Sequence, residues 1–430
     1  MNLARLLSRR LERSGPIRIG LIGAGKFGSM FLAQVPTTAG LSIAGIADLL
    51  PERARLVCQR VGWDAARLAA VPITDDAAAL IGRPEIEVIV EATGHPVAGI
   101  RHARAAIAAG KHIVMVNVEG DALAGPLLAA EASAAGVVYS LAYGDQPALI
   151  CELVDWARAA GFRVLAAGKG TKYLPAYHAS TPETVWQHYG LTAEQAAAGG
   201  MNAKMFNSFL DGTKSAIEMA AVANATGLAA PADGLGFPPA ATGELASVLG
   251  AMPGQVEVVS SLYRNGQPVA NDLRWGVYVV FEAPGAYTAR CFKEYGVATD
   301  GSGTRAALYR PSHFVGLELG ISVISAVLRG EPTGAAERFR ADVVAVAKKA
   351  LAAGAHLDGE GGAMVWGKLV PAATSLAAGG LPIGLASGLK LRRPVAAGRM
   401  LTWDDVVLDP SEETYRYRRR MEAAARACSG

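Results

Sequence analysis

The sequence has few cysteines and no long apolar segment. Its 430 residues contain 4 cysteines, none in a Cys-x-x-Cys pair, which argues against a disulfide framework and a zinc site. The 7 histidines form no His-x-x-x-His or His-Glu-x-x-His pair, so we expect no dedicated metal site. No run of about 18 apolar residues could span a membrane. Residues 1–15 resemble an amphipathic helix rather than a signal peptide, so we expect a cytoplasmic protein.

The net charge is also small. Lysine and arginine total 41 against 38 acidic residues, a formal charge of +3, which argues against electrostatic binding of nucleic acid or of a membrane surface. With 51% hydrophobic and 18% charged residues, the chain has the composition of a globular protein large enough for two or three domains. We therefore expect its partner to be a small molecule.

What the sequence does contain is a regular alternation of strand-like and helix-like segments in its first third. This pattern is typical of an α/β fold with a parallel sheet and helices on both faces. The expected strands are 17–22, 41–47, 87–93, 112–118 and 137–143, with helices that include 97–109 and 123–135. Beyond residue 144 the pattern predicts helices at 145–161, 203–225, 313–329 and 335–353, a strand at 162–167, strand-like residues 276–295 and a compact β-like tail.

A glycine motif follows the first expected strand and opens a helix. The segment Gly23-Ala24-Gly25-Lys26-Phe27-Gly28 has the spacing of a dinucleotide-binding turn, and Asp48 stands 20 residues after Gly28. Its glycines permit a tight turn, close approach of a pyrophosphate and close helix packing, while the helix N-terminus attracts the phosphates. This motif predicts a doubly wound Rossmann-type domain that binds NAD(P).

The type of nicotinamide cofactor stays open at this stage. Asp48 favours NADH because its charge repels a 2′-phosphate, but Arg53 and Arg55 lie close enough to weaken that repulsion, so NADPH is also allowed. Thr93 and Gly94 follow another strand at the expected nicotinamide edge and are candidate cofactor contacts. His95, beside a proline, fits a helix start better than a substrate contact.

Lysine is scarce but locally concentrated. The chain has 11 lysines and 30 arginines, and four of the lysines fall between residues 169 and 214. In a sequence that prefers arginine, this suggests a need for compact ammonium groups with adjustable pKa, although four surface lysines would look the same. These lysines are Lys169, Lys172, Lys204 and Lys214.

The expected helix 203–225 carries polar residues at helical spacing. Asn207, Asp211, Lys214 and Glu218 would share one face, and Gly212 in mid-helix would cost about 1 kcal/mol, which suggests close approach of a ligand. A solvated face of ion pairs is the alternative. Asp211 and Glu218 would also suit a transient magnesium ion with substrate oxygens, although nothing demands a metal. The preceding aromatic loop, with Tyr173 and His178, would form the other wall.

Three long segments resemble a known family. These are IRIGLIGAGKFGSMFLAQ, GKGTKYLPAYHASTPETVWQHYG and MNAKMFNSFLDGTKSAIEMAAVANATG, which are similar to homoserine-dehydrogenase-like oxidoreductases and, more narrowly, to the 1-deoxy-D-xylulose 5-phosphate reductoisomerase-like subgroup. Residues 389–408 resemble a SAF domain, a small β-clip module. The resemblance implies a homodimer with an NAD(P) domain at 1–148, an α+β catalytic domain at 149–330 and a small C-terminal domain at 331–430.

The resemblance also implies chemistry. Reductoisomerases rearrange a phosphorylated ketose and reduce the resulting aldehyde with NADPH or NADH. In that scheme Lys169 and Lys172, with Tyr173, His178 and Asn207, would bind a phosphorylated or acidic substrate. Lys204 or Lys214 would then act as acid or base with Asp211 or Glu218.

Two alternatives to a reductoisomerase stay open. One is a dehydrogenase of a small sugar acid, polyol or homoserine-like substrate, and the other is a non-catalytic nucleotide-binding regulator. Homoserine itself matches less well, because Val116-Asn117-Val118-Glu119 lacks the lysine that homoserine dehydrogenases carry there.

Overall fold

The computed structural model describes residues 2–429. The chain forms two compact units, and each is built from two stretches of sequence. Unit 1 comprises Met1–Glu152 and His313–Glu337, and unit 2 comprises Leu153–Ser312 and Arg338–Gly430. The first boundary falls inside helix α8 (Gln146–Ala159). The three-domain division 1–148, 149–330 and 331–430 stays a prediction.

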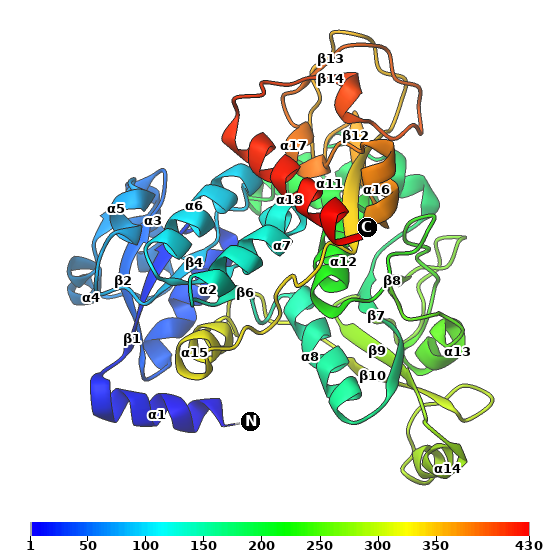
Figure 1. The fold of residues 1–430 in the computed structure, drawn as a ribbon, viewed down its shortest axis with the longest axis horizontal. Coiled ribbons are helices and arrows are strands. Elements are labelled where there is room, and N and C mark those ends of the chain that lie inside the picture. The colour runs from blue at the N-terminus through cyan, green and yellow to red at the C-terminus, as the bar shows by residue number, and fades with distance from the viewer. Residues whose placement is uncertain (1, 430) are drawn as a thin grey trace. The chain divides into compact units, whose positions relative to one another are not determined.

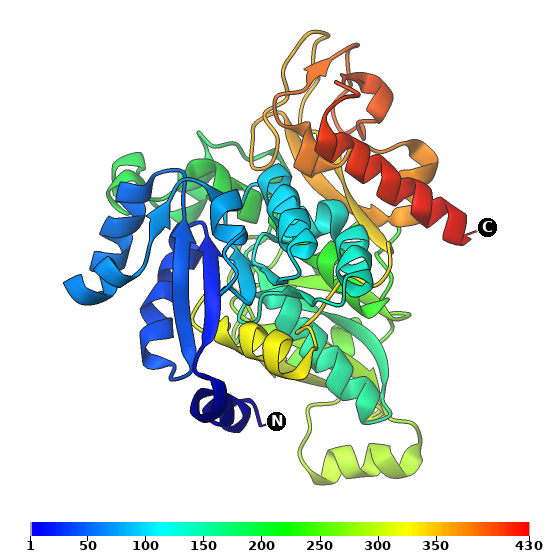
Figure 2. The ribbon, with the colours of Figure 1, turned by 60° about the vertical axis from the view of Figure 1, so that its left-hand side comes forward.

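Unit 1 contains a six-stranded sheet in the order β3-β2-β1-β4-β5-β6, with every neighbouring pair parallel. This order confirms the expected doubly wound α/β fold, because the chain moves outward from β1 in one direction and then in the other. Figure 2 shows β1 and β2 with helices on both sides. The strands are β1 (Ile17–Ile22), β2 (Leu41–Ala47), β3 (Ile73–Thr74), β4 (Val88–Glu91), β5 (His112–Met115) and β6 (Tyr139–Leu141).

A helix from late in the sequence completes unit 1. Helix α15 (Gly320–Arg329) packs against α1 (Leu3–Ser14), β5 and β6, and Figure 1 shows it in yellow near the blue N-terminal helix. Leu319 and Val323 are fully buried in the core of the sheet. The other unit 1 helices are α2 (Lys26–Gln34), α3 (Pro51–Arg60), α4 (Ala65–Ala70), α5 (Ala77–Ile81), α6 (Pro96–Ala108) and α7 (Val118–Ala134).

Unit 2 is built around a mixed sheet in the order β10-β9-β7-β8. Helix α12 (Thr213–Thr226) packs against β7 and β8 on one side. On the other it packs against the pair formed by β11 (Ala341–Ala347) and β12 (Val365–Pro371). The strands are β7 (Arg163–Thr171), β8 (Gln255–Ser260), β9 (Val277–Glu282) and β10 (Arg305–Arg310), and the remaining helices up to residue 312 are α9 (Val185–Tyr189), α10 (Ala193–Ala198), α11 (Ala203–Leu210), α13 (Leu245–Leu249) and α14 (Ala286–Glu294).

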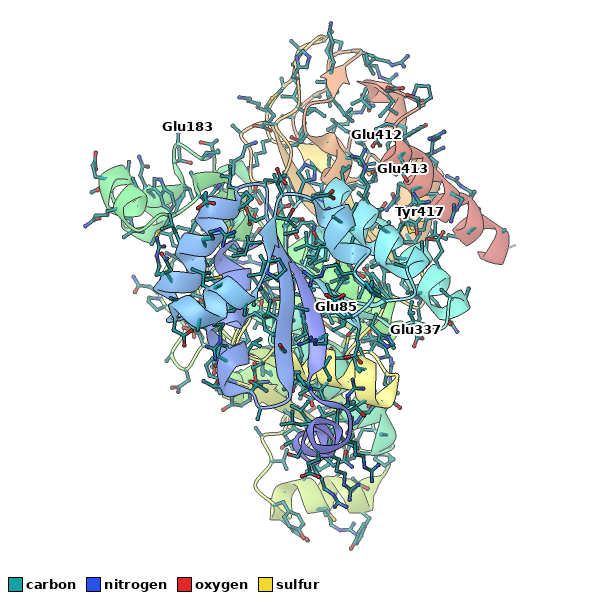
Figure 3. The ribbon with its side chains drawn as sticks, turned by 90° about the vertical axis from the view of Figure 1, so that its left-hand side faces the viewer. Glu85, Glu183, Glu337, Glu412, Glu413 and Tyr417 are labelled. Carbon is teal, nitrogen blue, oxygen red and sulfur yellow. The ribbon has the colours of Figure 1, made fainter. Side chains whose placement is uncertain are left out.

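The C-terminal part of unit 2 consists of small antiparallel sheets and a final helix. Helix α18 is held to β11 by Arg418, a buried side chain that pairs with Asp342 and with Glu422. Figure 2 shows α18 in red, and Figure 3 labels Glu412 and Glu413 where it begins. The elements are β11 (Ala341–Ala347), β12 (Val365–Pro371), α16 (Ala372–Ala378), α17 (Ile383–Ala386), β13 (Lys390–Leu391), β14 (Val406–Val407) and α18 (Glu413–Ser429).

Two of the helix predictions made from the sequence are wrong. Residues 335–353 form strand β11 rather than a helix, because the run Ala341–Ala347 is buried along its whole length and pairs with β12. The expected helix 203–225 is two helices, α11 and α12, separated at Asp211 and Gly212. Gly212 is therefore not in mid-helix: it precedes α12 with φ +90°, a conformation that favours glycine.

Two strand boundaries also differ from expectation. Strand β7 continues to Thr171, beyond the expected end at residue 167, so Lys169 lies on a buried strand and not in a loop. Of the strand-like residues 276–295, only Val277–Glu282 form a strand, and Ala286–Glu294 form helix α14. Within the described residues, no helix is long and apolar enough to cross a membrane.

Candidate active site

The glycine motif adopts the backbone that a dinucleotide-binding turn requires. Gly23 has φ +96°, and a Cβ there would lie 2.7 Å from the Ala92 carbonyl carbon. A Cβ on Gly28 would lie 2.3 Å from the Gly23 oxygen, so only glycine lets α2 approach the turn. A Cβ on Gly25, the residue before α2, would meet no atom within 4 Å. The space in front of Gly25 is thus open to a pyrophosphate.

Asp48 follows β2 and fixes the glycine turn. Its Oδ2 accepts a hydrogen bond from the Ala24 amide at 2.8 Å, and its Oδ1 accepts one from the Leu50 amide at 3.0 Å. Lys26 is exposed and Phe27 is partly buried in the first turn of α2. These positions suit the cofactor roles expected of all three residues, although the roles themselves stay a prediction.

The end of β4 carries a buried polar cluster. Glu91 is fully buried, and its Oε1 accepts hydrogen bonds from Thr93 Oγ1 at 2.6 Å and His102 Nδ1 at 3.2 Å. Gly94 has φ +69° and open space where a Cβ would stand. His95 caps helix α6 by accepting a hydrogen bond from the Ala98 amide, which confirms that it starts a helix. This cluster holds the Thr93–Gly94 turn at the carboxyl edge of the sheet.

In unit 2, the start of α12 is surrounded by buried charge. Asp211 is fully buried, and its Oδ2 accepts a hydrogen bond from Lys348 Nζ at 2.7 Å. Lys348 also donates to the carbonyls of Ser180 and Gly362, each at 2.7 Å, so all three of its N–H groups are used. Burial raises the pKa of Asp211, and the charge of Lys348 opposes that rise. This pair therefore anchors β11 to the start of α12.

A second buried ion pair involves Glu218, which lies further along α12. Lys169 on β7 forms an ion pair with Glu218 on α12, and both side chains are at most 7% exposed. Lys214 lies one turn before Glu218 and is partly buried. A buried ammonium beside a carboxylate holds a transferable proton, which is what acid–base chemistry at a substrate oxygen needs.

An aromatic group encloses His178 beside these pairs. The Nδ1 atom of His178 lies 2.7 Å from the Asp211 carbonyl oxygen, and because a carbonyl can only accept, Nδ1 is the donor. In the neutral ring, Nε2 is then an acceptor. Tyr173 Oη donates to that Nε2 at 2.9 Å. The ring stacks on Trp366 with centroids 3.9 Å apart, while Tyr173 stacks on Phe237 at 3.8 Å.

This environment fixes the protonation of both polar rings. Burial lowers the pKa of His178, and the charges of Lys348 and Lys368 lower it further against an opposing backbone hydrogen bond. Burial raises the pKa of Tyr173 to about 12. At neutral pH the pair therefore consists of a neutral imidazole and a protonated phenol.

The other expected substrate residues are not gathered at this place. Lys172 donates to the His188 carbonyl at 2.5 Å and lies over the Tyr189 ring, and burial lowers its pKa. Lys204 is exposed and donates to the Asp358 carbonyl at 2.7 Å. Asn207 is fully buried and bonds to Ser180 and to the Gly361 carbonyl. The structure gives Lys204 and Asn207 anchoring contacts, and their expected catalytic and binding roles stay untested predictions.

Two residues of this centre were missed by sequence reasoning. Lys348 and Trp366 come from β11, β12 and their connection, more than 130 positions after Asp211 in the chain. Their only local signal is that Lys348 ends a continuous apolar run. Among the residues described, no three His, Cys, Asp or Glu side chains gather as a metal site. Asp211 and Glu218, considered for magnesium, are each paired with a lysine.

Comparison with protein families gives three matches along the chain. Residues 17–116 match the NAD-binding Rossmann fold of the GFO/IDH/MocA oxidoreductase family, residues 144–319 match the catalytic domain of oxidoreductase DRL, and residues 342–407 match the SAF domain. The SAF match begins at Asp342 and so includes β11 and β12, well before the expected residue 389. No curated protein matches the chain.

Several solved structures share part of the fold. A probable dehydrogenase from Thermotoga maritima is 14% identical, with a TM-score of 0.38 over 74% of this chain and 90% of its own. A homoserine dehydrogenase from Thiobacillus denitrificans is 22% identical, with a TM-score of 0.37 over 50% of this chain and 49% of its own. A putative oxidoreductase from Klebsiella pneumoniae is 17% identical, with a TM-score of 0.37 over 73% of this chain and 85% of its own.

The family matches agree with the geometry of the glycine turn. An oxidoreductase nucleotide domain is followed by an oxidoreductase catalytic domain, so the non-catalytic alternative does not hold. The chain is an NAD(P)-dependent oxidoreductase whose nucleotide domain matches the GFO/IDH/MocA family, whose central part matches a DRL catalytic domain and whose C-terminal part matches a SAF domain.

Proposed function

We propose that this oxidoreductase reversibly reduces the carbonyl group of a small phosphorylated or acidic ketose or polyol-derived substrate. Reduction of a carbonyl needs a hydride at carbon and a proton at oxygen. The glycine turn would hold the nicotinamide nucleotide, which would supply the hydride when bound. Side chains in unit 2 are our candidates for the proton donor.

The buried Lys169–Glu218 pair carries this proposal. As charge develops on the substrate oxygen, the Lys169 ammonium stabilises it and then gives it a proton. Glu218 orients the ammonium through the ion pair. In the oxidative direction the same pair takes the proton from the substrate hydroxyl.

The Lys348–Asp211 pair and the aromatic residues around His178 have a positioning role and support the Lys169–Glu218 pair. Lys348 has no N–H left to offer a substrate, so it holds Asp211 and the start of α12 in place. His178 is bonded to the Asp211 carbonyl and to Tyr173, and its stacking on Trp366 fixes the ring. Lys214, partly buried on the same helix as Glu218, is the cation we assign to the substrate's phosphate or carboxylate.

A reductoisomerase would rearrange the carbon skeleton before the same reduction. The resemblance of this chain to the reductoisomerase-like subgroup favours that reaction. The geometry favours reduction alone, because Lys348 is fully engaged with Asp211 and two carbonyls, whereas the Lys169–Glu218 pair is placed for a single proton transfer. Incubating the full chain with 1-deoxy-D-xylulose 5-phosphate and NADPH or NADH separates the two, since only rearrangement yields a branched product.

The test of the proton-transfer pair uses three variants with a panel of ketose phosphates, sugar acids and homoserine. We expect Lys169→Arg to keep the ion pair but to lower kcat by about 10²- to 10⁴-fold, because an arginine does not release its proton. Glu218→Gln should shift the pH profile of kcat. Lys293→Met, an exposed lysine on α14, is the control and should keep full activity.

The outcomes are distinguishable. Unchanged melting temperature and NADH affinity with lost turnover in Lys169→Arg support the assignment. Turnover above one tenth of the parent value shows that Lys169 is not the proton donor. No turnover of any panel member by the parent protein would show that the proposed substrate class is wrong.

A further inference from the structure

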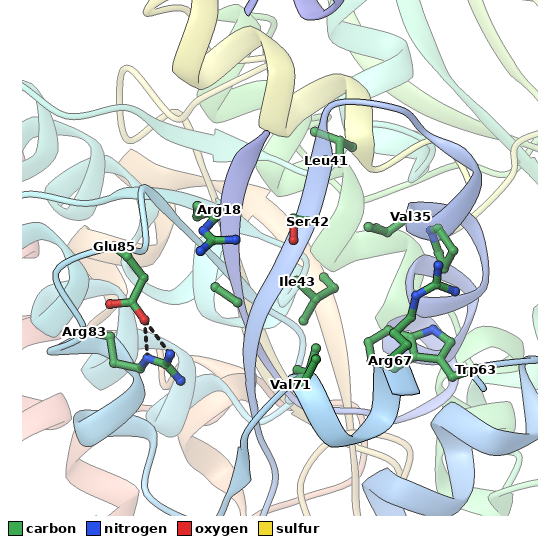
Figure 4. A pocket seen from close by; sticks show the side chains of 13 residues that line it. Arg18, Val35, Leu41, Ser42, Ile43, Trp63, Arg67, Val71, Arg83 and Glu85 are labelled. Atoms are coloured by element: carbon green, nitrogen blue, oxygen red, sulfur yellow. Dashed lines mark hydrogen bonds and ion pairs between the residues drawn. The ribbon is translucent and has the colours of Figure 1, made fainter. Parts of the chain in front are cut away.

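A cavity of about 350 Å³ lies at the amino-terminal edge of the unit 1 sheet. Its walls come from the first residues of β1 and β2 and from the segments that lead into β3 and β4, and Figure 4 shows it from close by. The glycine turn and Asp48 follow the opposite ends of β1 and β2. Since β1 has 6 residues, the two edges are about 20 Å apart. The cavity is therefore separate from the expected cofactor site.

The short length of β3 explains why the sheet leaves space here. Strand β3 pairs only with Ile46 and Ala47, the last two residues of β2. The first part of β2 therefore has no strand on its outer side within the described sheet. Ser42, Ile43 and Ala44 from that part of β2 line the cavity.

The cavity carries more positive than negative charge. Arg18, Arg67 and Arg83 line it together with one carboxylate, Glu85. Arg83 donates to Glu85 Oε1 at 2.7 Å, as the dashed lines in Figure 4 mark. Within residues 2–429, neither the Arg18 nor the Arg67 guanidinium forms an ion pair with a carboxylate, although Arg18 lies near enough to help lower the pKa of Glu85. Two guanidinium charges thus remain for an anion.

Apart from Ser42, the rest of the lining is apolar. Trp63 is 6% exposed, and its indole N–H donates to the Leu32 carbonyl at 2.9 Å, which fixes the ring. Arg67 lies over that ring, 5.9 Å from its centroid. Val35 and Ile43, both buried, add aliphatic surface. A ligand would meet Trp63, the aliphatic residues and the Arg67 guanidinium on one side and the Arg18 guanidinium on the other.

We propose that this cavity binds a small amphipathic anion, with a carboxylate or phosphate on an aromatic or branched aliphatic body. Guanidinium groups bind both head groups through paired N–H donors, and an indole offers a flat apolar surface to the body. A volume of about 350 Å³ suits a molecule of this size and is small for a dinucleotide. The site goes beyond the proposed function and does not depend on it.

Binding is tested by calorimetry on the full chain saturated with NADH, so that the cofactor site is occupied. The probes are phenyl phosphate, phenylacetate, inorganic phosphate and benzyl alcohol. We expect phenyl phosphate or phenylacetate to bind at least tenfold more tightly than inorganic phosphate and benzyl alcohol. Equal binding of inorganic phosphate would overturn the apolar part of the proposal, and no binding of any probe would overturn it entirely.

Variants tie the binding to this cavity. Arg18 and Arg67 are exposed, so the double change Arg18→Gln and Arg67→Gln should leave the fold intact and weaken phenyl phosphate binding at least tenfold. Arg60→Gln, an exposed arginine on α3 outside the cavity, is the matched control and should bind as the parent does. Equal loss in both, or none in the double variant, would place the ligand elsewhere.

A spectroscopic readout is independent of affinity. The indole N–H resonance of Trp63, identified by its absence in Trp63→Phe, should shift when phenyl phosphate is added. An unchanged Trp63 signal during measurable binding would contradict the proposal.

Discussion

Asp121 on α7 makes the stability of unit 1 depend on pH in an unusual direction. Its side chain is fully buried, and Tyr139 Oη donates to its Oδ1 at 2.8 Å. Within residues 2–429 its Oδ2 has no hydrogen-bond partner. Burial raises the pKa of this carboxyl from 3.8 to about 6, against the opposing hydrogen bond from Tyr139. The folded protein therefore holds this proton more tightly than the unfolded chain does.

The size of the effect follows from that shift. One pKa unit corresponds to about 1.4 kcal/mol, so a rise of about two units corresponds to about 3 kcal/mol. Between pH 4 and 6 the folded state binds more protons than the unfolded state, and stability from this group falls as the pH rises. It is fully present below pH 4 and fully lost above about pH 6.

The variant Asp121→Asn removes the ionisation while it keeps the size of the side chain. We expect the free energy of unfolding of the variant, relative to the parent, to rise by about 3 kcal/mol between pH 4 and 7. A difference in the free energy of unfolding that is the same at every pH measures how well the amide fits. Only the change of this difference with pH measures the ionisation of the Asp121 carboxyl. Trp63 is the single tryptophan of unit 1, so the ¹⁹F signal of fluorotryptophan at this position follows urea unfolding of that unit.

A second variant checks the cause. Tyr139→Phe removes a hydrogen bond that favours the charged carboxylate, so the pH range of the effect should extend upward. A difference between Asp121→Asn and the parent that stays flat from pH 4 to 7 would refute the argument that burial dominates at Asp121.

Three further changes test the glycine turn, the anchoring pair and the cofactor preference. Gly28→Ala places a Cβ 2.3 Å from the Gly23 oxygen, so we expect unit 1 to lose about 1–3 kcal/mol in urea unfolding and NADH binding to weaken in calorimetry. Lys348→Met leaves Asp211 charged and buried without its cation, which should cost unit 2 about 3–5 kcal/mol, and adding Asp211→Asn should recover part of that loss. Asp48→Ala removes the charge that opposes a 2′-phosphate, so the ratio of NADPH to NADH affinity should rise at least tenfold; an unchanged ratio would show that Asp48 does not select the cofactor.

The sequence predicted five of the six strands of the unit 1 sheet because their signals are local, but it predicted neither β3 nor the place of α15 in this unit. Strands such as 17–22 and 41–47 are short apolar runs between helical segments, and the glycine motif stands where a strand meets a helix. The run 341–347 misled the prediction because its alanines and valines fit either a helix or a buried strand. The run forms a strand because it pairs with β12, and no feature of the local sequence indicates that pairing.

The candidate site in unit 2 was predictable only in part for the same reason. Lys169, His178, Asp211 and Glu218 were expected from their residue types and spacing, and the structure brings them around the start of α12. Their partners Lys348 and Trp366 come from the SAF region, and no spacing rule connects residues so far apart in the chain.

The late position of α15 affects how the protein is made. A ribosome releases residues 1–152 long before residues 313–337, yet the core of unit 1 needs Leu319, Val323 and Ile324 from the later stretch. At about 5–20 residues per second, the first part waits roughly 10–40 s for its last helix. During that time the face of the sheet that α15 covers is open to other nascent chains and to chaperones. A fragment that ends at residue 152 would keep this face permanently exposed, so the nucleotide domain is best produced with α15 joined to it by a short linker.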